Sequence, residues 1–151
     1  MNILVCAAHP DDEILGCGAT IAKLSKEHFV QVVIFGQGGT DRPDALRYVQ
    51  QLQREAEAAA EILGASIAFH DLPDNEFDTV SLLSIIQRVE REIRRIQPEV
   101  IYTHHPCCLN IDHRRWFEAV LTATRPMTDC PVRELYAFEI PSSTEWAFHL
   151  G

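Results

Sequence analysis

The sequence has few basic residues. Lysine and arginine together number 13 against 22 acidic residues, which gives the 151-residue chain a formal net charge of −9 at pH 7. Proteins that bind nucleic acid need a basic face to contact the phosphates, so this balance argues against DNA or RNA as a partner. No apolar stretch approaches the roughly 20 residues that a membrane-spanning helix requires. We therefore expect no nucleic-acid partner and no membrane span.

The sequence also lacks the cysteine patterns of a disulfide-stabilised or cysteine-zinc protein. Its five cysteines include no C-x-x-C pair, and two of them, Cys107 and Cys108, are adjacent. An odd count without paired spacing favours a reducing compartment, and no segment has the basic leader and apolar length of a secretion signal. We expect a cytoplasmic protein. Because the sequence fixes no basic residue beside them, we interpret Cys107 and Cys108 as loop residues and not as nucleophiles.

Strands and helices are expected to alternate along the whole chain, without internal repeats. Continuous runs of β-branched and other apolar residues predict buried strands, and apolar residues at helical spacing predict the helices between them. Such strands favour a doubly wound, Rossmann-like α/β fold, with a mostly parallel sheet in the order 3-2-1-4-5 and helices on both faces. The strands are expected at about residues 2–8, 29–35, 66–69, 99–103 and 133–140, and the helices at about 12–26, 44–63 and 81–95, with a last helix ending near 124.

Two unusual loops follow the first and the fourth predicted strands. The first is Ala8-His9-Pro10-Asp11-Asp12-Glu13, and the second runs from His104 to His113. In the order 3-2-1-4-5 these strands are neighbours where the winding reverses, and ligands bind there, outside the carboxyl ends of the strands. We therefore expect the two loops to form one site. The glycines at 36–39 follow a different strand and lack the G-x-G-x-x-G spacing, so we predict no dinucleotide site.

Three residues of these loops suit a catalytic zinc site. His9, Asp12 and His113 supply two imidazoles and one carboxylate, a donor set that leaves positions for water and substrate. Asp11 would project differently from the ligands and would accept a proton from a water at the metal. Together these residues predict a metal-dependent hydrolytic site.

Several neighbouring residues keep two interpretations. Asp112 either holds the ring nitrogen of a ligating histidine or caps the next helix. Acidic residues are common at helix starts, which would explain Asp12 alone, and we expect Glu13 only to begin the helix. Of His104 and His105 only one can face the site, because successive residues of a strand alternate. The histidine that faces the site would stabilise an oxyanion, and we assign this role to His105.

The two loops together carry a family resemblance. The motif A-H-P-D-D-E at residues 8–13, paired with H-P-x-x-x-N-x-D-H at residues 105–113, resembles the PIG-L/LmbE-like N-acetylglucosaminyl deacetylases. The resemblance implies a zinc-dependent amidase that removes an N-acetyl group from a GlcNAc-type sugar or sugar conjugate. Carried over by motif, the metal ligands are His9, Asp12 and His113, and the general base is Asp11.

The chain departs from the family pattern at two points. Family members often have a histidine three residues before the last ligand, where this chain has Asn110. Oxyanion support would then come from Asn110, from His104 or His105, or from the metal. Arg54 and Asp74 lie in stretches that resemble substrate-contacting segments. Family members also usually continue beyond this length, so we expect one deacetylase-like domain over residues 1–151 without the usual C-terminal portion.

The leading hypothesis is a cytoplasmic zinc hydrolase whose partner is a small N-acetylated sugar or conjugate. Fe2+ or another divalent metal would suit the same ligands, and a homo-oligomer is compatible with the sequence. One alternative is a non-catalytic domain that binds metal or glycan. A second is an Fe(II) enzyme with the same two histidines and one carboxylate, which the α/β pattern disfavours.

Overall fold

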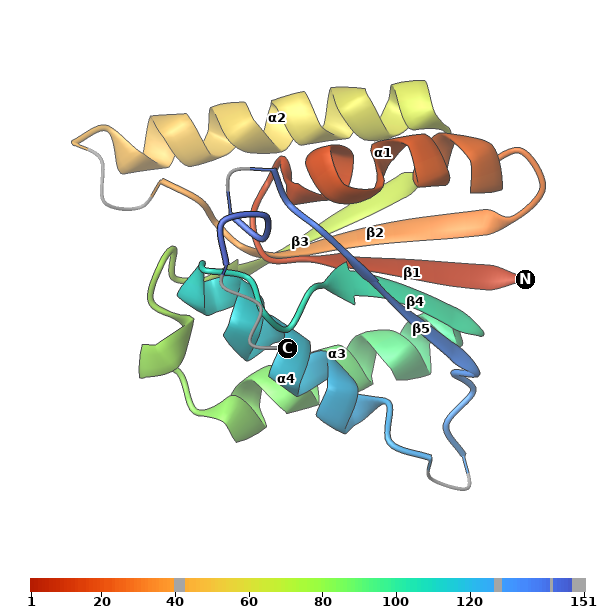
Figure 1. Ribbon diagram of the computed structural model, residues 1–151. Helices are drawn as coiled ribbons and strands as arrows, with labels where there is room; N and C mark the ends of the chain where they lie inside the picture. The colour runs from red at the N-terminus through yellow and green to blue at the C-terminus, as the bar shows by residue number, and fades with distance from the viewer. Residues whose placement is uncertain (40–42, 127–128, 142, 148–151) are drawn as a thin grey trace.

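The computed structural model describes residues 1–39, 43–126, 129–141 and 143–147. Its centre is a sheet of five parallel strands in the order β3-β2-β1-β4-β5, which confirms the predicted topology (Figure 1). β3 continues beyond its predicted end because residues up to Leu72 still pair with β2 after a register shift near Gly36. The strands are β1 (Asn2–Ala7), β2 (Phe29–Gly36), β3 (Ser66–Leu72), β4 (Val100–His104) and β5 (Glu134–Phe138).

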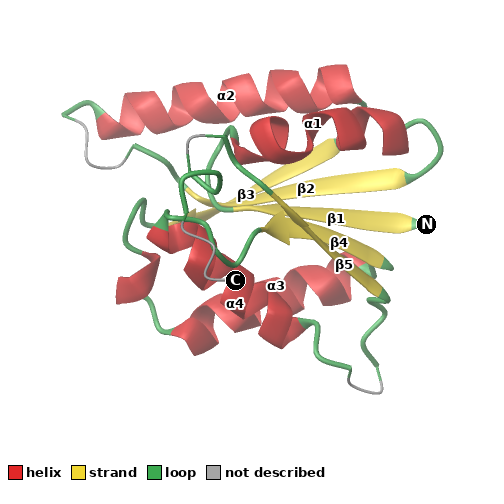
Figure 2. Cartoon of the chain, in the orientation of Figure 1, coloured by secondary structure: helices red, strands yellow, loops and turns green. Residues whose placement is uncertain are grey.

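Helices cover both faces of the sheet, as predicted. α1 and α2 lie over one face, and α3 and α4 lie over the other (Figures 1 and 2). The elements are α1 (Asp12–Leu24), α2 (Ala45–Leu63), the short 3-10 helix η1 (Phe77–Thr79), α3 (Leu82–Ile96) and α4 (Ile111–Ala123). Within the described residues, no helix is both long enough and apolar enough to cross a bilayer.

The central strand β1 is buried from both sides. Ile3, Val5 and Ala7 pack in one hydrophobic cluster together with residues of α1 and α2. Leu4 and Cys6 pack in a second cluster with residues of α3 and α4. Successive side chains of a strand point to opposite faces, so a strand covered by helices on both sides must be apolar throughout. This explains the uninterrupted apolar run from Ile3.

Gly36 allows the end of β2 to lie against the loop that follows β1. Its N–H donates a hydrogen bond to the Ala8 carbonyl oxygen at 2.7 Å. A Cβ at this position would lie 2.7 Å from the same oxygen and 3.0 Å from the Phe77 ring. Any side chain larger than hydrogen would therefore displace the backbone immediately before His9.

The strand order brings the two unusual loops together. β1 pairs with β4, with Ile3 opposite Val100 and Val5 opposite Tyr102. The residues that follow these strands consequently leave the sheet side by side at its carboxyl edge, where β2 lies on one side of β1 and β4 on the other. This is the predicted switch point, and the candidate site lies there.

Candidate metal centre and cavity

Two histidines and one aspartate converge at the carboxyl edge of the sheet. His9 Nδ1 lies 3.4 Å from Asp12 Oδ2, and His113 Nε2 lies 3.2 Å from the same oxygen. The two ring nitrogens are 3.4 Å apart. Three potential ligand atoms, from the first turn of α1, the preceding loop and the first turn of α4, thus surround one point. Two imidazoles and one carboxylate form a donor set that zinc and iron both accept.

The second ring nitrogen of each histidine has its own partner. His9 Nε2 lies 2.8 Å from Asp112 Oδ2, and His113 Nδ1 lies 3.1 Å from Cys108 Sγ. A proton on each of these outer nitrogens leaves His9 Nδ1 and His113 Nε2 with free lone pairs that face Asp12. Metal-ligating histidines generally donate their other N–H in this way, which fixes the tautomer and the ring orientation.

Asp112 holds the ring of His9, which is one of its two predicted roles. The carboxylate is fully buried. It also accepts the backbone N–H groups of Asn75 at 2.7 Å and Phe77 at 3.0 Å, so the loop after β3 is tied to the same group. The helix cap comes from Asn110, whose Oδ1 accepts the N–H groups of Asp112 at 2.8 Å and His113 at 3.4 Å. The side-chain oxygen of Asn110 is therefore used to cap the start of α4.

The acidic groups favour positive charge at this centre. Burial lowers the pKa of His9, but hydrogen bonds to Asp112 and Asp12 outweigh it and raise the pKa to about 10. Burial also lowers the pKa of His113, while its bonds to Asp12 and Cys108 raise it to about 9. Burial would raise the pKa of Asp12, but the three surrounding histidines hold it well below its usual range. The centre thus stabilises positive charge, carried either by ring protons or by a metal ion that replaces them.

His104, and not His105, lies against the centre. The His104 ring is fully buried and stacks on His113 with centroids 3.9 Å apart. Its Nε2 accepts the Ala8 N–H at 2.9 Å, and burial lowers the pKa of the ring to about 4, so it is neutral. His105 Nδ1 instead accepts the N–H of Cys107 within the loop. Of the two histidines that we considered, the last residue of β4 thus points inward, and His105, in the loop that follows, is not among the cavity-lining residues.

Asp11 stands at the N-terminal cap position of α1 but makes no capping bond with its side chain. Its φ of 117° is a backbone conformation that costs a residue other than glycine about 1–3 kcal/mol. Burial and the charge of Asp12 raise its pKa to about 6. The side chain lies in the wall of a cavity that also contains His9, Asp12 and His113. A carboxylate in this position, free of the helix end, has the placement that a general base needs.

Glu13 does more than begin the helix. Its side chain is only 2% exposed, and Oε2 accepts the backbone N–H of Asp11 at 3.0 Å. Burial raises the pKa of this carboxyl to about 7. The sequence interpretation missed this contact because acidic residues in a first turn are common and usually solvated.

A cavity of about 460 Å³ opens over the centre, within the roughly 300–1,000 Å³ typical of small-molecule sites. Asp74, for which we predict a substrate contact, lines it, with Oδ1 3.2 Å from His9 Nε2 and Oδ2 accepting the Gly39 N–H at 2.6 Å. Arg54 is exposed on α2 and is not among the lining residues. Gly38 and Gly39, both with φ of 67°, form part of the wall, a role that the sequence did not predict. The other lining residues are Pro10, Leu15, Tyr48, Leu52, Asn75, Asn110, Ile140, Pro141 and Ser143.

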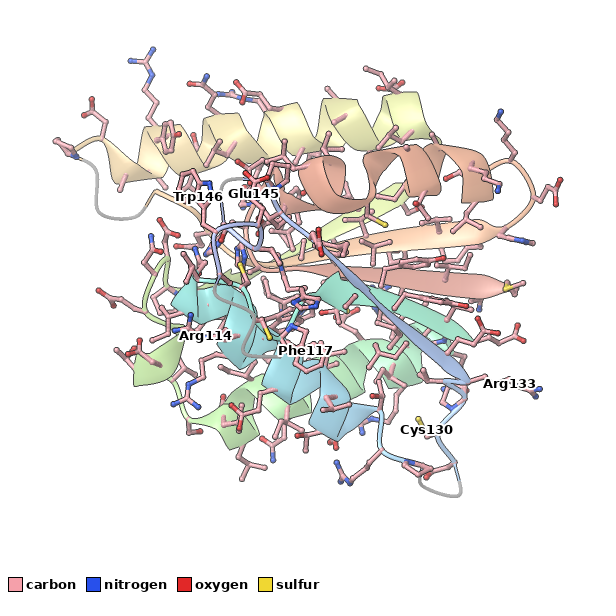
Figure 3. The ribbon with its side chains drawn as sticks, viewed as in Figure 1. Arg114, Phe117, Cys130, Arg133, Glu145 and Trp146 are labelled. Atoms are coloured by element: carbon pink, nitrogen blue, oxygen red, sulfur yellow. The ribbon has the colours of Figure 1, made fainter. Side chains whose placement is uncertain are left out.

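The segment after β5 closes one side of this cavity. Ile140, Pro141 and Ser143 line it, and Ser143 Oγ lies 2.7 Å from Cys108 Sγ. Figure 3 shows Glu145 and Trp146 of this segment at the end of the molecule where α1 begins, and Cys130 and Arg133 toward the opposite end. The chain therefore returns along β5 to the metal centre.

Cys108 is expected to support metal binding through His113. Its buried sulfur lies 3.1 Å from His113 Nδ1. Cys108→Ala removes the acceptor for that N–H, and we expect the metal Kd to rise about 10- to 100-fold, the usual effect of losing an outer partner of a ligand. Cys108→Ser, which keeps an acceptor, should recover part of the affinity, and competition with a chelator measures both. Cys130→Ala is the matched control; equal Kd values for Cys108→Ala and Cys130→Ala would contradict the role.

Comparison with known proteins places this geometry in a family. The model of the PIG-L family, described as GlcNAc-PI de-N-acetylase, matches residues 4–124. The chain is 29% identical over 153 residues to the uncharacterized deacetylase YaiS of Escherichia coli K12, covering 94% of this chain and 75% of that protein. It is also 27% identical over 169 residues to a 4-oxalmesaconate hydratase of Pseudomonas putida, covering 96% and 64%.

Solved structures share the fold. The N,N'-diacetylchitobiose deacetylase of Pyrococcus horikoshii superposes with a TM-score of 0.71 at 27% identity, over 83% of this chain and 51% of that one. The chain thus spans about half of the length of this structural relative and three quarters of the length of YaiS.

Proposed function

Because the chain belongs to the PIG-L family of GlcNAc-PI de-N-acetylases, we propose that it is a zinc-dependent hydrolase that removes an N-acetyl group from a sugar or sugar conjugate. The observation that carries this proposal is the paired bonding of the two histidines. His9 and His113 each direct one ring nitrogen at Asp12 and bind an outer partner, Asp112 or Cys108, with the other. Such an arrangement suits the binding of a metal ion.

The chain's own residues supply the rest of the chemistry. A divalent metal held by His9, Asp12 and His113 would polarise an amide carbonyl and make nearby water more acidic. Asp11, in the wall of the same cavity, accepts the proton that the attacking water loses as its oxygen bonds to the carbonyl carbon. When the C–N bond breaks, Asp11 returns that proton to the departing amine. Acetate and the free amine are the products.

The charge of the cavity supports an N-acetyl sugar as substrate. Asp11, Asp12 and Asp74 line it, and no lysine or arginine is among the lining residues of the described chain. A neutral sugar amide meets no repulsion there, and the amine that it releases is attracted to the carboxylates.

Hydration of an unsaturated carboxylate is the second candidate, because a relative at 27% identity is a 4-oxalmesaconate hydratase. An anionic substrate of that kind would meet the carboxylates of Asp11, Asp12 and Asp74, and no lysine or arginine is among the described lining residues to pair with it away from the metal centre. The cavity therefore favours deacetylation.

A substrate screen tests the proposal. Purified protein loaded with Zn2+ is incubated with N-acetylglucosamine, its oligomers and its glycosides, and both free amine and acetate are measured. Release of amine and acetate in equal amounts supports deacetylation. Metal binding without turnover on these compounds, but with loss of the ultraviolet absorbance of an unsaturated carboxylate, would replace the proposal by the hydratase.

Zinc and the cytoplasm are parts of the same proposal. Elemental analysis of protein purified without added metal distinguishes zinc from iron at these ligands. All five cysteines are free thiols, which supports a reducing compartment such as the cytoplasm.

A further inference from the structure

Next to His9 and Asp12, at the start of α1, the chain has a buried carboxylate that takes no part in the proposed chemistry. Glu13 lies in the first turn of α1, between α1 and the neighbouring α2, and its side chain is 2% exposed. Buried carboxylates are retained at a cost in free energy unless they bind a partner. The partner here is a backbone donor, the N–H of Asp11, at 3.0 Å from Oε2.

Asp11 is in a conformation that needs outside support. Its φ is 117° and its ψ is −29°, a combination rarely adopted by residues with a side chain. Its carbonyl oxygen accepts the N–H groups of Ile14 at 3.0 Å and Leu15 at 2.9 Å, so the carbonyl side of the residue is fixed by the helix. The amide side is fixed by Glu13. Strained backbone of this kind persists only where neighbouring groups hold it from both sides.

The hydrogen bonds that hold the backbone of Asp11 also determine the direction of its side chain. Aspartate at an N-terminal cap position ordinarily turns its carboxylate back onto the N–H groups of the first turn. Asp11 makes no such bond and lines the cavity beside the metal ligands. Without an acceptor for its N–H, the residue would relax toward ordinary backbone angles, in which the carboxylate caps the helix and leaves the cavity.

We propose that Glu13 is a positioning residue for the general base: it receives the Asp11 N–H and so keeps the Asp11 carboxylate directed into the cavity instead of capping α1. This inference rests on the proposed hydrolase function. Asp12 makes a similar contact with the amide two residues before Asp11: its Oδ2 accepts the His9 N–H at 2.8 Å. The two carboxylates together hold alternate amides of the loop.

The test compares variants that keep or remove the acceptor. Glu13→Met preserves the length and bulk of the side chain but accepts no hydrogen bond. We expect it to lower kcat for amine release by about 10- to 100-fold, the usual effect of displacing a catalytic group by an ångström or less, with KM and bound metal unchanged. Glu13→Gln keeps a carbonyl acceptor and should restore turnover to within about threefold of the parent. Glu92→Met is the matched control, because Glu92 is a buried glutamate of α3 whose carboxylate binds His70 and Arg95.

A double variant separates positioning from general damage. If Glu13 acts through Asp11, adding Glu13→Met to Asp11→Asn lowers kcat no further, because the base is already absent. A loss that multiplies in the double variant, or equal losses for Glu13→Met and Glu13→Gln, would overturn the inference. Should Glu13→Met not fold, Glu13→Asp applies the same test, since its shortened carboxylate withdraws from the amide.

Hydrogen exchange of the Asp11 amide gives a readout that does not depend on any substrate. Exchange should be slow in the parent and in Glu13→Gln, and faster by about tenfold or more in Glu13→Met or Glu13→Asp. Unchanged protection in those two variants would refute the role of Glu13 even if the enzyme is active. Absence of turnover in the parent, with the expected exchange pattern, would instead refute the hydrolase function and leave the Glu13–Asp11 contact in place.

Discussion

Asp11→Asn is expected to lower kcat for release of amine from the best N-acetyl substrate by about 10²- to 10⁴-fold, the usual contribution of a general base. The amide of asparagine is nearly the same size as the carboxylate but cannot accept a proton. Metal content should stay at the parental level, because Asp11 is not one of the three residues whose donor atoms converge, His9, Asp12 and His113. Parallel assays of turnover and metal content check both statements.

Asp44→Asn is the matched control for this prediction. Asp44 occupies the N-terminal cap position of α2 and, like Asp11 at α1, makes no capping bond with its side chain. The same chemical change there leaves the cavity untouched, because Asp44 is exposed and outside its lining. If Asp11→Asn turned over substrate at the parental rate, the assignment of the base would be wrong, and Asp74, another carboxylate that lines the cavity, would become the candidate.

His113→Ala is expected to abolish stoichiometric metal binding, and with it activity. His113 provides one of the three donor atoms of this group, and its loss leaves two of them, on His9 and Asp12. We expect the metal Kd to rise by well over the roughly 10- to 100-fold that follows loss of an outer partner such as Cys108. Calorimetric titration of metal into the chelator-treated protein measures the change.

His28→Ala serves as the control for nonspecific effects of removing a histidine. His28 lies in the turn between α1 and β2, which enters the sheet at the edge opposite to the metal centre. Its removal should leave metal content unchanged. Equal loss of metal in the two variants would contradict the ligand set, and retention of one metal per chain in His113→Ala would do so as well.

Much of the fold was predictable because its signals are local. The apolar run of β1 and the helical spacing of Leu82, Ile85 and Ile86 in α3 are properties of neighbouring residues, and the structure confirms the strand order that they imply. The meeting of the loops after β1 and β4 also followed from this order, since adjacent parallel strands end at the same edge. The boundaries were less accurate at β3, where pairing with β2 extends the strand through polar residues.

The sequence alone indicated which residues carry the chemistry of the candidate site. His9, Asp12 and His113 are recognisable because histidine and aspartate in a loop after a buried strand are poorly explained by packing. Their convergence within hydrogen-bonding distance follows from the strand order. Asp74 and Arg54 were both suggested as substrate contacts by resemblance alone; Asp74 lines the cavity and Arg54 is not among its lining residues.

The partners of these residues were decided by tertiary structure. The sulfur of Cys108 reaches His113 because the loop after β4 folds back on α4, and nothing in the sequence distinguishes it from the exposed Cys107. The inward direction of His104 depends on where β4 ends.

Sequence by itself determined the element order, the sheet topology and the donor types available at one edge, since these depend on periodicity and residue chemistry. Only the folded chain decided which ring nitrogen faces the metal position, which outer group holds it and how Glu13 supports Asp11. Such contacts join atoms by distance and direction, and small differences in backbone angle, as at Asp11 with its φ of 117°, determine whether they form.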